Sequence, residues 1–482
     1  MVFNSIDFLI FFPIVCLVYF VIPKKVRYIW LLVASYYFYM SWNPSYAALI
    51  AISTVITYLS GIFIEKSDTK TKKNACVALS FIINIGILAV FKYGNFFLEN
   101  VYSLTKALGI TVREAHLDLL LPVGISFYTF QALSYTMDVY RKRIKPERNI
   151  LRYALFVSFF PQLVAGPIER SENLLTQVQN VENIELFDKD RIRDGFMIMF
   201  YGFFQKLVIA DRASIVVRQV YQHYTNYGAV EIILASVLFA FQIYCDFGGY
   251  SNIARGAAKV MGFDLMHNFK TPYMATSIKE FWRRWHISLT SWFTDYLYIP
   301  LGGNRKGQIR KYINILIVFG VSGLWHGASY NFIAWGLIHA IFQIAGDIKN
   351  RYIIKNRHDN EVLRILRIIG TFILTDFAWI FFASDRFMHA IHVIGQMFTG
   401  VKKASLLSLG LDEKMWGVLI VALILLVIVD ILHDHKVSLM KFFRKQNVVV
   451  RYAMAIVLCY LTVLFGVYGV GYDASTFIYF QF

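Results

Sequence analysis

The chain has 482 residues, of which 57% are hydrophobic and only 16% are charged, and its mean hydropathy is +0.52. Average soluble domains carry about a quarter charged residues, so this composition excludes an ordinary soluble fold. The net charge of +17 does not indicate a nucleic-acid partner, because the basic residues are divided into short clusters between apolar stretches.

Apolar stretches that approach the roughly 17–25 residues of a membrane span recur along the chain. They are residues 6–22, 28–42, 45–64, 75–90, 119–137, 153–167, 196–210, 232–245, 313–345, 368–383, 415–429 and 452–470. Allowing for stretches that split or re-enter the membrane, they predict an all-α polytopic membrane protein with about ten to thirteen spans. The first stretch lacks a basic flank before it and a small-residue cleavage site after it, so we expect a retained span.

The distribution of basic residues predicts the topology. Clusters at 24–27, 70–73 and 141–148 alternate with connections, 43–44 and 95–118, that carry little excess positive charge. Cytoplasmic loops are enriched in lysine and arginine. We therefore expect both ends of the chain outside a plasma or inner membrane, with the basic loops in contact with lipid headgroups on the cytoplasmic side.

The middle third of the chain, residues 241–346, mixes apolar runs with Gly, Asp, Arg, His and Trp. Polar groups at membrane depth are tolerated where they are buried in protein or line a water-filled cavity. This region is therefore expected to hold the functional site. The four cysteines are scattered and show no metal-ligand spacing, so no metal site is expected.

Residues 244–263 read YCDFGGYSNIARGAAKVMGF. The glycine and alanine residues allow helices to approach closely, which is the simpler explanation of this stretch. Close packing does not explain Asp246, because an ionisable side chain at membrane depth is costly and usually functional.

Residues 278–307 read IKEFWRRWHISLTSWFTDYLYIPLGGNRKG. On a continuous helix, an aromatic face would include Trp282, Trp285 and His286. An amphipathic helix at the membrane interface would explain the aromatic and basic residues. It explains His286 less well, because an imidazole on an apolar face has two ring nitrogens to satisfy.

Residues 322–329, SGLWHGAS, lie in a long run without a charged residue. His326 follows Trp325, and Ser322 lies about one turn earlier. A single buried histidine is usually a hydrogen-bonded core residue, whereas an ionisable group at membrane depth is often functional, and both interpretations stay open at this point. His339 falls on a different helical face and is expected to be structural.

Together these stretches resemble the membrane-bound O-acyltransferase (MBOAT) superfamily, and within it the alginate O-acetylase branch, whose bacterial members acetylate extracellular polysaccharides or peptidoglycan. The stretches SFYTFQALSYTMDVYR at 126–141, FFPQLVAGPIER at 159–170 and the terminal FIYFQF at 477–482 belong to the same pattern. The resemblance covers most of the chain and is densest from about residue 122 to residue 339. Several long motifs occur in the expected order, which makes the resemblance specific.

The resemblance implies a single membrane domain in which the helices, some re-entrant or interfacial, surround a central tunnel. Residues 1–118 would form N-terminal scaffold spans, 119–346 the catalytic core, 347–470 the C-terminal spans and 471–482 an extracellular tail. An acyl thioester, here acetyl-CoA, would enter from the cytoplasm as donor substrate, and no cofactor would be permanently bound. The acetyl group would pass to an extracellular partner, an SGNH-type acetyltransferase or another cell-surface acetylation protein.

By the same resemblance, His326 matches the invariant histidine of the superfamily and His286 its second active-site position. Tyr479 matches a terminal tyrosine proposed to carry the acyl group outward. A neutral imidazole with a pKa near 6.5 can accept the proton of an attacking hydroxyl, a role we assign to His326. His286 would position the acyl carbonyl or stabilise the oxyanion. A phenol has a pKa of about 10, so its ester stays activated, provided that the tail folds back into the tunnel.

Two further groups of residues are assigned to the site. Tunnel or substrate contacts are expected from Asp246, Trp282, Trp285, Trp325 and Ser322. Contacts with CoA phosphates at the cytoplasmic mouth are expected from Arg283, Arg284, Arg305 and Lys306, since guanidinium and ammonium groups pair with phosphate.

Two alternatives to acetyl transfer remain at this point. A related enzyme of the same superfamily would move D-alanine onto teichoic acids, but that system resembles one with a shorter membrane protein and a separate tail peptide. A transporter would use the buried histidines and Asp246 for ion or proton passage. No inverted repeat is visible in the sequence, although many transporters have one. Thioester consumption would distinguish both transferases from a transporter.

Overall fold

The computed structural model describes residues 1–110, 112–164, 166–352, 360–398, 406–468 and 477–478. Helices dominate these residues, and no strand occurs among them. Within these ranges, seven helices are long and apolar enough to cross a membrane, which confirms an all-α, multi-pass membrane protein. They are α3 (Tyr46–Lys66), α4 (Lys70–Ala107), α11 (Ala229–Val260), α15 (Tyr330–Tyr352), α16 (Glu361–Ala383), α18 (Glu413–Asp434) and α20 (Val448–Phe465). The larger predicted number of spans includes shorter helices, which length and composition alone do not assign to the membrane.

The chain folds into two compact units. Unit 1 comprises Met1–Arg193 and Ala257–Met266, and unit 2 comprises Asp194–Gly256 and His267–Phe482. Helix α11 contributes most of its length to unit 2. Every site residue predicted from the sequence has its position in unit 2, so this unit carries the functional argument.

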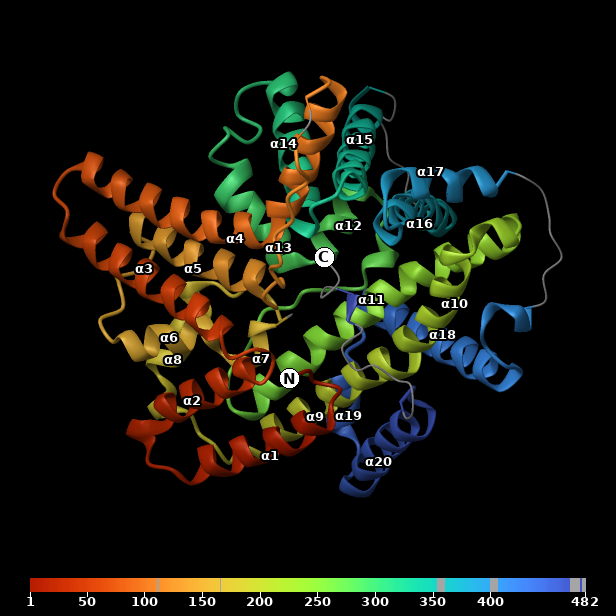
Figure 1. Cartoon of the computed structure of the whole chain (residues 1–482). Coiled ribbons are helices and arrows are strands. Elements are labelled where there is room, and N and C mark those ends of the chain that lie inside the picture. Colours follow the sequence, from red (N-terminus) through yellow and green to blue (C-terminus); the bar gives the residue numbers. More distant parts are fainter. Residues whose placement is uncertain (111, 165, 353–359, 399–405, 469–476, 479–482) are drawn as a thin grey trace. The chain divides into compact units, whose positions relative to one another are not determined.

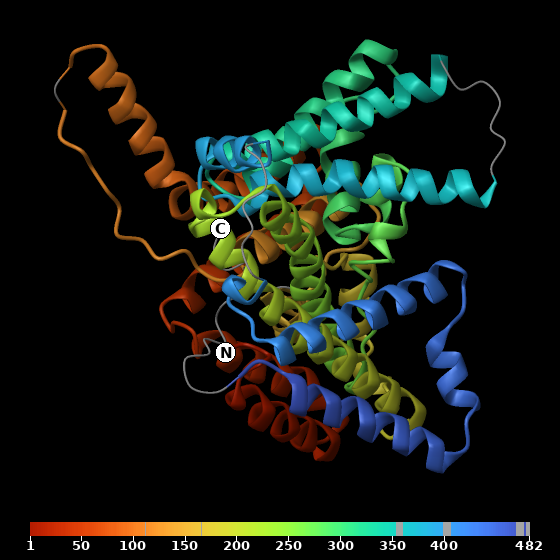
Figure 2. The ribbon, with the colours of Figure 1, turned by 90° about the vertical axis from the view of Figure 1, so that its right-hand side faces the viewer.

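Unit 1 contains the N-terminal helices, coloured red to yellow in Figure 1. Besides α3 and α4 they are α1 (Ile6–Val21), α2 (Arg27–Met40), α5 (Ile125–Tyr140), α6 (Ile150–Ser158), α7 (Phe160–Leu163) and α8 (Thr176–Gln179). Helix α4 extends beyond the apolar stretch predicted at 75–90, because both its ends carry polar helix-forming residues that hydropathy does not detect. Figure 2 shows α4 projecting from the other helices of unit 1, followed by an extended orange connection to α5.

The stretch at 126–141 that contributed to the family resemblance forms α5, which is buried in unit 1. A Cβ atom on Gly61 in α3 would lie 2.7 Å from the Tyr135 hydroxyl oxygen, so only glycine allows the two helices to approach this closely. The Gln131 amide donates to the Phe156 carbonyl at 2.6 Å and accepts from Gln162 at 2.9 Å. These buried amides are paired, as their burial requires. This stretch therefore serves the packing of unit 1.

Unit 2 contains the remaining helices. Besides α11, α15, α16, α18 and α20 they are α9 (Lys189–Phe203, which begins in unit 1), α10 (Asp211–Gln222), α12 (Ile278–Arg284), α13 (Ile287–Phe293), α14 (Gln308–His326), α17 (Phe387–Gln396) and α19 (Leu439–Lys445). A π-helical segment, η4 (Phe204–Ala210), joins α9 to α10. In Figure 2 the short α19 connects the blue helices α18 and α20.

The apolar stretch predicted at 313–345 is two helices rather than one. Helix α14 ends at His326 and α15 begins at Tyr330, so Gly327, the second glycine of the SGLWHGAS motif, lies in the turn between them. The two helices pack closely because each has a glycine that faces the other helix. A Cβ atom on Gly323 of α14 would lie 2.3 Å from the Phe332 carbonyl oxygen, and one on Gly336 of α15 would lie 2.2 Å from the Phe319 carbonyl oxygen. This close approach fixes the end of α14, where His326 lies.

Candidate active site

His326 is the last residue of α14, and its side chain is enclosed by aromatic rings. The imidazole centroid lies 4.9 Å from the Trp325 ring, 4.9 Å from the Trp335 ring in α15 and 5.4 Å from the Phe382 ring in α16. Only 3% of the residue is exposed. Three helices of unit 2 therefore hold this imidazole in one place.

His286 is placed differently, in a break between two short helices. The continuous helix predicted through this region is wrong, because α12 ends at Arg284, Trp285 is extended and His286 has φ 42° and ψ 53°. This left-handed conformation is uncommon for a residue other than glycine and persists where surrounding contacts impose it. Such backbone strain is often found at functional sites.

The backbone on both sides of His286 is held by a neighbouring extended segment. The Lys270 amide donates to the Arg284 carbonyl, and the Ile287 amide donates to the Asn268 carbonyl, each at 2.9 Å. The Asn268 side chain also accepts from the Ser288 hydroxyl at 2.6 Å and donates to Ser251 at 3.1 Å. These hydrogen bonds stabilise the break in the helix and direct the His286 ring into the core of unit 2.

The break brings the two histidines together, although 40 residues separate them in the chain. The ring centroids of His286 and His326 are 6.3 Å apart, and the Trp325 ring lies 5.9 Å from His286. His286 is 1% exposed, and this burial lowers its pKa from 6.5 to about 3 because the charged imidazolium is poorly solvated there. Its imidazole is therefore neutral at physiological pH, and it can donate one hydrogen bond and accept another.

Trp282, Trp285 and Ser322, predicted as tunnel or substrate contacts, are all buried, and the two tryptophan rings pack against other aromatic side chains. Trp282 packs edge-on against Trp335 and His339, at 5.6 Å and 5.0 Å. Trp285 lies 5.0 Å from Trp379 in α16. The two tryptophans therefore form the wall behind the histidine pair, together with Trp335 and Trp379, which sequence analysis did not single out.

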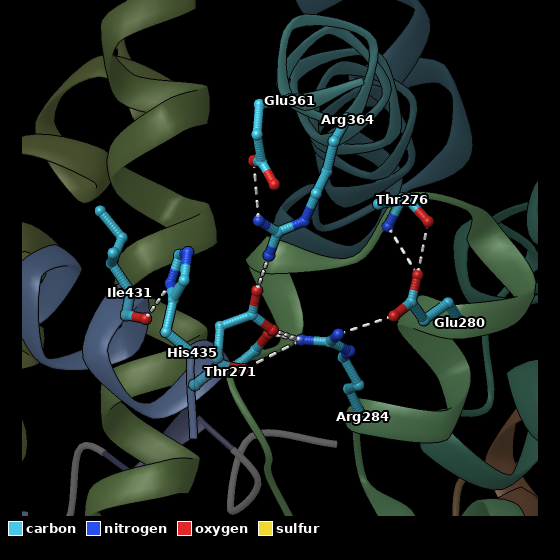
Figure 3. A network of polar contacts seen from close by, with 9 residues as sticks. Thr271, Thr276, Glu280, Arg284, Glu361, Arg364, Ile431 and His435 are labelled. Atoms are coloured by element: carbon cyan, nitrogen blue, oxygen red, sulfur yellow. Dashed lines mark hydrogen bonds and ion pairs between the residues drawn. The ribbon is translucent and has the colours of Figure 1, made fainter. Parts of the chain in front are cut away.

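Arg284 lies in a network of ion pairs that joins α12 to α16 and α18 (Figure 3). Its guanidinium donates to Glu280 and to Asp434, each at 2.6 Å, and Asp434 is also paired with Arg364. With two carboxylates already bound, Arg284 has reduced capacity for a CoA phosphate in this arrangement. The network instead fixes the end of α12, two residues before His286.

The other three residues predicted to contact CoA phosphates are Arg283, Arg305 and Lys306, and all are exposed. Arg305 and Lys306 lie in the turns that precede α14. Their exposure leaves them accessible to an anionic substrate. Their assignment stays a prediction.

Asp246 is buried and belongs to a cluster of charged side chains. Lys206 Nζ lies 2.6 Å from Asp246 Oδ1 and 2.8 Å from Asp211 Oδ1, and all three side chains are at most 6% exposed. Asp246 was predicted from the sequence as a site residue, whereas Lys206 was not. The available signal was a single lysine within the apolar stretch at 196–210, since ionisable residues in predicted spans are usually paired or functional.

The C-terminal motif returns to the interior of unit 2 at its first two residues. Phe477 is 0% exposed and Ile478 is 4% exposed. The Ile478 amide donates to Asp246 Oδ2 at 2.7 Å, and the Phe477 ring lies 4.5 Å from Tyr250. Tyr479, the predicted acyl carrier, lies outside the described residues.

These features define a polytopic α-helical membrane protein with two buried imidazoles in an aromatic enclosure. A sequence profile of the MBOAT, membrane-bound O-acyltransferase family, matches residues 141–357, which include both histidines. Sequence comparison also finds relatives over most of the chain. The probable alginate O-acetylase of Pseudomonas syringae pv. tomato is 37% identical over 405 residues, 83% of this chain and 74% of the relative.

Two other relatives carry different names. The peptidoglycan O-acetyltransferase of Helicobacter pylori is 34% identical over 434 residues, 84% of this chain and 80% of the relative. The teichoic acid D-alanyltransferase of Bacillus subtilis is 27% identical over 276 residues, 55% of this chain and 70% of the relative. The chain belongs to the membrane-bound O-acyltransferase family, and it is a multi-pass membrane O-acyltransferase. A transporter, the alternative from another class, is not supported by this family membership.

Proposed function

We propose that the protein takes acetyl from cytoplasmic acetyl-CoA and passes it through the membrane for O-acetylation of a cell-surface polysaccharide or peptidoglycan. The observation that carries this proposal is the pair of imidazoles 6.3 Å apart in the interior of unit 2. The relatives named as alginate and peptidoglycan O-acetylating proteins support acetyl as the acyl group. The D-alanyltransferase relative matches a smaller share of this chain at lower identity, which makes D-alanyl transfer the second candidate.

The proposed reaction is attack of an acceptor hydroxyl on the thioester. His326 accepts the hydroxyl proton as the oxygen bonds to the carbonyl carbon, which is the general-base step. When the tetrahedral intermediate collapses, the C–S bond breaks and the CoA thiolate takes up the proton from His326. The products are an O-acetyl ester and CoA with a free thiol group.

His286 has a different proposed role at the same reaction centre. A neutral imidazole that donates one N–H can stabilise the oxyanion that develops on the thioester carbonyl. The aromatic enclosure strengthens such an interaction and excludes water that would hydrolyse the thioester. Because both rings are buried, donor and acceptor reach them only when neighbouring side chains move.

The acceptor hydroxyl in this proposal is the phenol of Tyr479. Its acetyl ester would be more activated than an alkyl ester, because a phenol has a pKa of about 10. An extracellular SGNH-type acetyltransferase would then accept the acetyl group on its serine, and Tyr479 would regain its proton. The burial of Phe477 and Ile478 supports this proposal, since the residues immediately before Tyr479 reach the interior of unit 2.

The proposal is tested by reconstituting the purified protein in lipid nanodiscs and measuring thiol release from acetyl-CoA. We expect the wild type to release CoA and the His326→Ala variant to release none above background. A D-alanyl-loaded carrier protein serves as the competing donor. Consumption of that donor in preference to acetyl-CoA would replace acetyl with D-alanyl, and no consumption of either would remove the transferase mechanism proposed for the site.

A further inference from the structure

The charged cluster at Lys206 joins one basic side chain to two acidic ones. One ammonium group, on Lys206, lies between two carboxylates, on Asp246 and Asp211, all within the low-dielectric interior of unit 2. Burying such a cluster is expensive, and an apolar replacement of the same volume is often at least as stable. Its presence therefore calls for a role beyond packing.

One carboxylate oxygen of the cluster is used by the C-terminal segment. Asp246 Oδ1 accepts from Lys206 Nζ, and Asp246 Oδ2 accepts from the Ile478 amide at 2.7 Å. The Phe477 ring completes the contact, with its centroid 5.9 Å from Lys206 Nζ and 4.5 Å from the Tyr250 ring. The segment is thus bound by a charge-assisted hydrogen bond and by a cation–π contact to the same cluster.

A second attachment holds the chain before the tail. The Val467 amide donates to the Leu207 carbonyl at 3.0 Å, and Arg212 donates to the Phe465 carbonyl at 2.8 Å. Leu207 lies beside Lys206 in η4, and Arg212 lies beside Asp211 at the start of α10. Phe465 and Val467 are therefore attached to the π-helical segment and the helix that follows it, whereas Ile478 is hydrogen-bonded to Asp246 in α11.

The cluster lies close to the histidine pair. Phe247 follows Asp246 in α11, and its ring lies 6.4 Å from Phe477 and 4.7 Å from His286. Phe477 is therefore linked to His286 through a single aromatic ring.

We propose that Lys206, Asp246 and Asp211 form a buried anchor that holds the C-terminal segment Phe477–Ile478 beside the histidine pair. The purpose of this anchor would be to present the terminal tyrosine to the acetyl group, and that purpose rests on the proposed function. The three residues are positioning residues, since they bind the tail rather than the reacting atoms. Release of the tail leaves a buried carboxylate oxygen without its donor, so the cluster favours the bound tail.

The anchor is tested by amide hydrogen exchange of the full-length protein in nanodiscs, read at the C-terminal peptide. Asp246→Asn keeps the ion pair between Lys206 and Asp211. The asparagine side chain has one acceptor oxygen in place of two, so it can no longer accept from both Lys206 Nζ and the Ile478 amide. We expect at least tenfold faster exchange of the Ile478 amide in this variant. Asp430→Asn is the matched control, because Asp430 is another buried carboxylate of unit 2 that accepts from Tyr244, and it should leave the tail protected.

A second variant covers the case in which Asp246→Asn disturbs the whole unit. Phe477→Ala changes the tail and leaves the charged residues intact, so faster exchange confined to the C-terminal peptide supports the anchor. Unchanged exchange of that peptide in Phe477→Ala, or in a folded Asp246→Asn variant, overturns it. The anchor also predicts a lower kcat for acetyl transfer in Asp246→Asn with an unchanged KM for acetyl-CoA, and a changed KM with unchanged kcat contradicts it.

The exchange measurement separates this inference from the proposed function, because it requires no acetyl donor. If the tail is released as expected but His326→Ala still transfers acetyl, the catalytic proposal fails and the anchor stands. If His326→Ala abolishes transfer but the tail stays protected in both tail variants, the anchor fails and the catalytic proposal stands.

Discussion

The two histidines lie close together in unit 2, but different kinds of contact hold them in place. His326 ends a regular helix whose position is set by close packing against α15, and the glycines of that contact leave no room for a Cβ atom. His286 lies in a strained break whose position is set by backbone hydrogen bonds of its neighbours with Asn268, which accepts, and with Lys270, which donates. The first arrangement is rigid through packing between helices, whereas the second depends on a few local polar contacts.

This difference fits the division of roles that we propose for the two histidines. A general base must stay aligned with the hydroxyl from which it takes a proton, and a packed helix end provides that alignment. A group that stabilises the oxyanion needs only a donor at the right distance. We therefore expect changes at His326 or at its helix contact to cost more activity than changes at His286.

The largest effect is expected from His326→Ala. Loss of the general base should lower acetyl transfer by about 10²–10⁴-fold, measured as CoA release by the reconstituted protein. His339→Phe is the matched control, because His339 is also buried among aromatic rings and stacks on Phe281, and a phenyl ring preserves that packing. Equal losses in both variants would show that the aromatic core, and not the His326 base, limits the rate.

A large effect is also expected from Gly323→Val, which tests the packing that fixes His326. The added side chain would overlap the Phe332 carbonyl, so we expect a loss of about 1–3 kcal/mol in the stability of the protein and a marked loss of activity. Gly346→Ala in α15 is the control, since nothing lies within 4 Å of its new Cβ atom. Thermal unfolding in detergent measures the stability of both variants, and CoA release measures their activity. A Gly323→Val protein as stable as the control would contradict the close helix contact.

An intermediate effect is expected from pH. The folded pKa of His286 is about 3 and the unfolded value about 6.5, so between these values the unfolded state binds more protons and stability falls as the pH falls. From pH 7 to pH 5, His286 should account for about 2 kcal/mol of lost stability. Thermal unfolding of wild type and His286→Asn at both pH values isolates this part. Equal losses in the two proteins would mean that His286 is not held neutral.

The smallest effect is expected from His286→Asn on activity. Asparagine accepts the left-handed backbone conformation more readily than histidine, so the fold should be kept or slightly stabilised. Its amide can still donate a hydrogen bond, so we expect about tenfold lower CoA release rather than complete loss. Complete loss in a folded variant would assign a proton-transfer role to His286.

Hydropathy was sufficient to predict much of the fold. The stretches at 6–22, 28–42 and 45–64 correspond to α1, α2 and α3 within a few residues, because each is bounded by proline, asparagine or charged residues. The break at Trp285 and His286 was not predictable in this way. It contains neither glycine nor proline, and it is held by backbone hydrogen bonds with Asn268 and Lys270, which lie earlier in the chain.

For the candidate site, the chemistry of the sequence singled out Asp246, since polar groups at membrane depth require an explanation. The sequence assigned both histidines to the site only through the family resemblance. It did not identify what those groups contact. Lys206 reaches Asp246 across 40 residues, and the tail reaches Asp246 across 232 residues, and such partners depend on the tertiary fold. Local sequence patterns carry no information on contacts between residues so far apart in the chain.

The central claim is that an acetyl thioester is opened at the histidine pair and that its acetyl group passes to the terminal tyrosine. The most direct measurement is to incubate the nanodisc-reconstituted protein with radiolabelled acetyl-CoA, without an acceptor, and to locate the label by peptide mass spectrometry. The proposed mechanism predicts an acetyl ester on Tyr479, absent from His326→Ala and from Tyr479→Phe. Label on a different residue, or equal labelling of the His326→Ala protein, would contradict it.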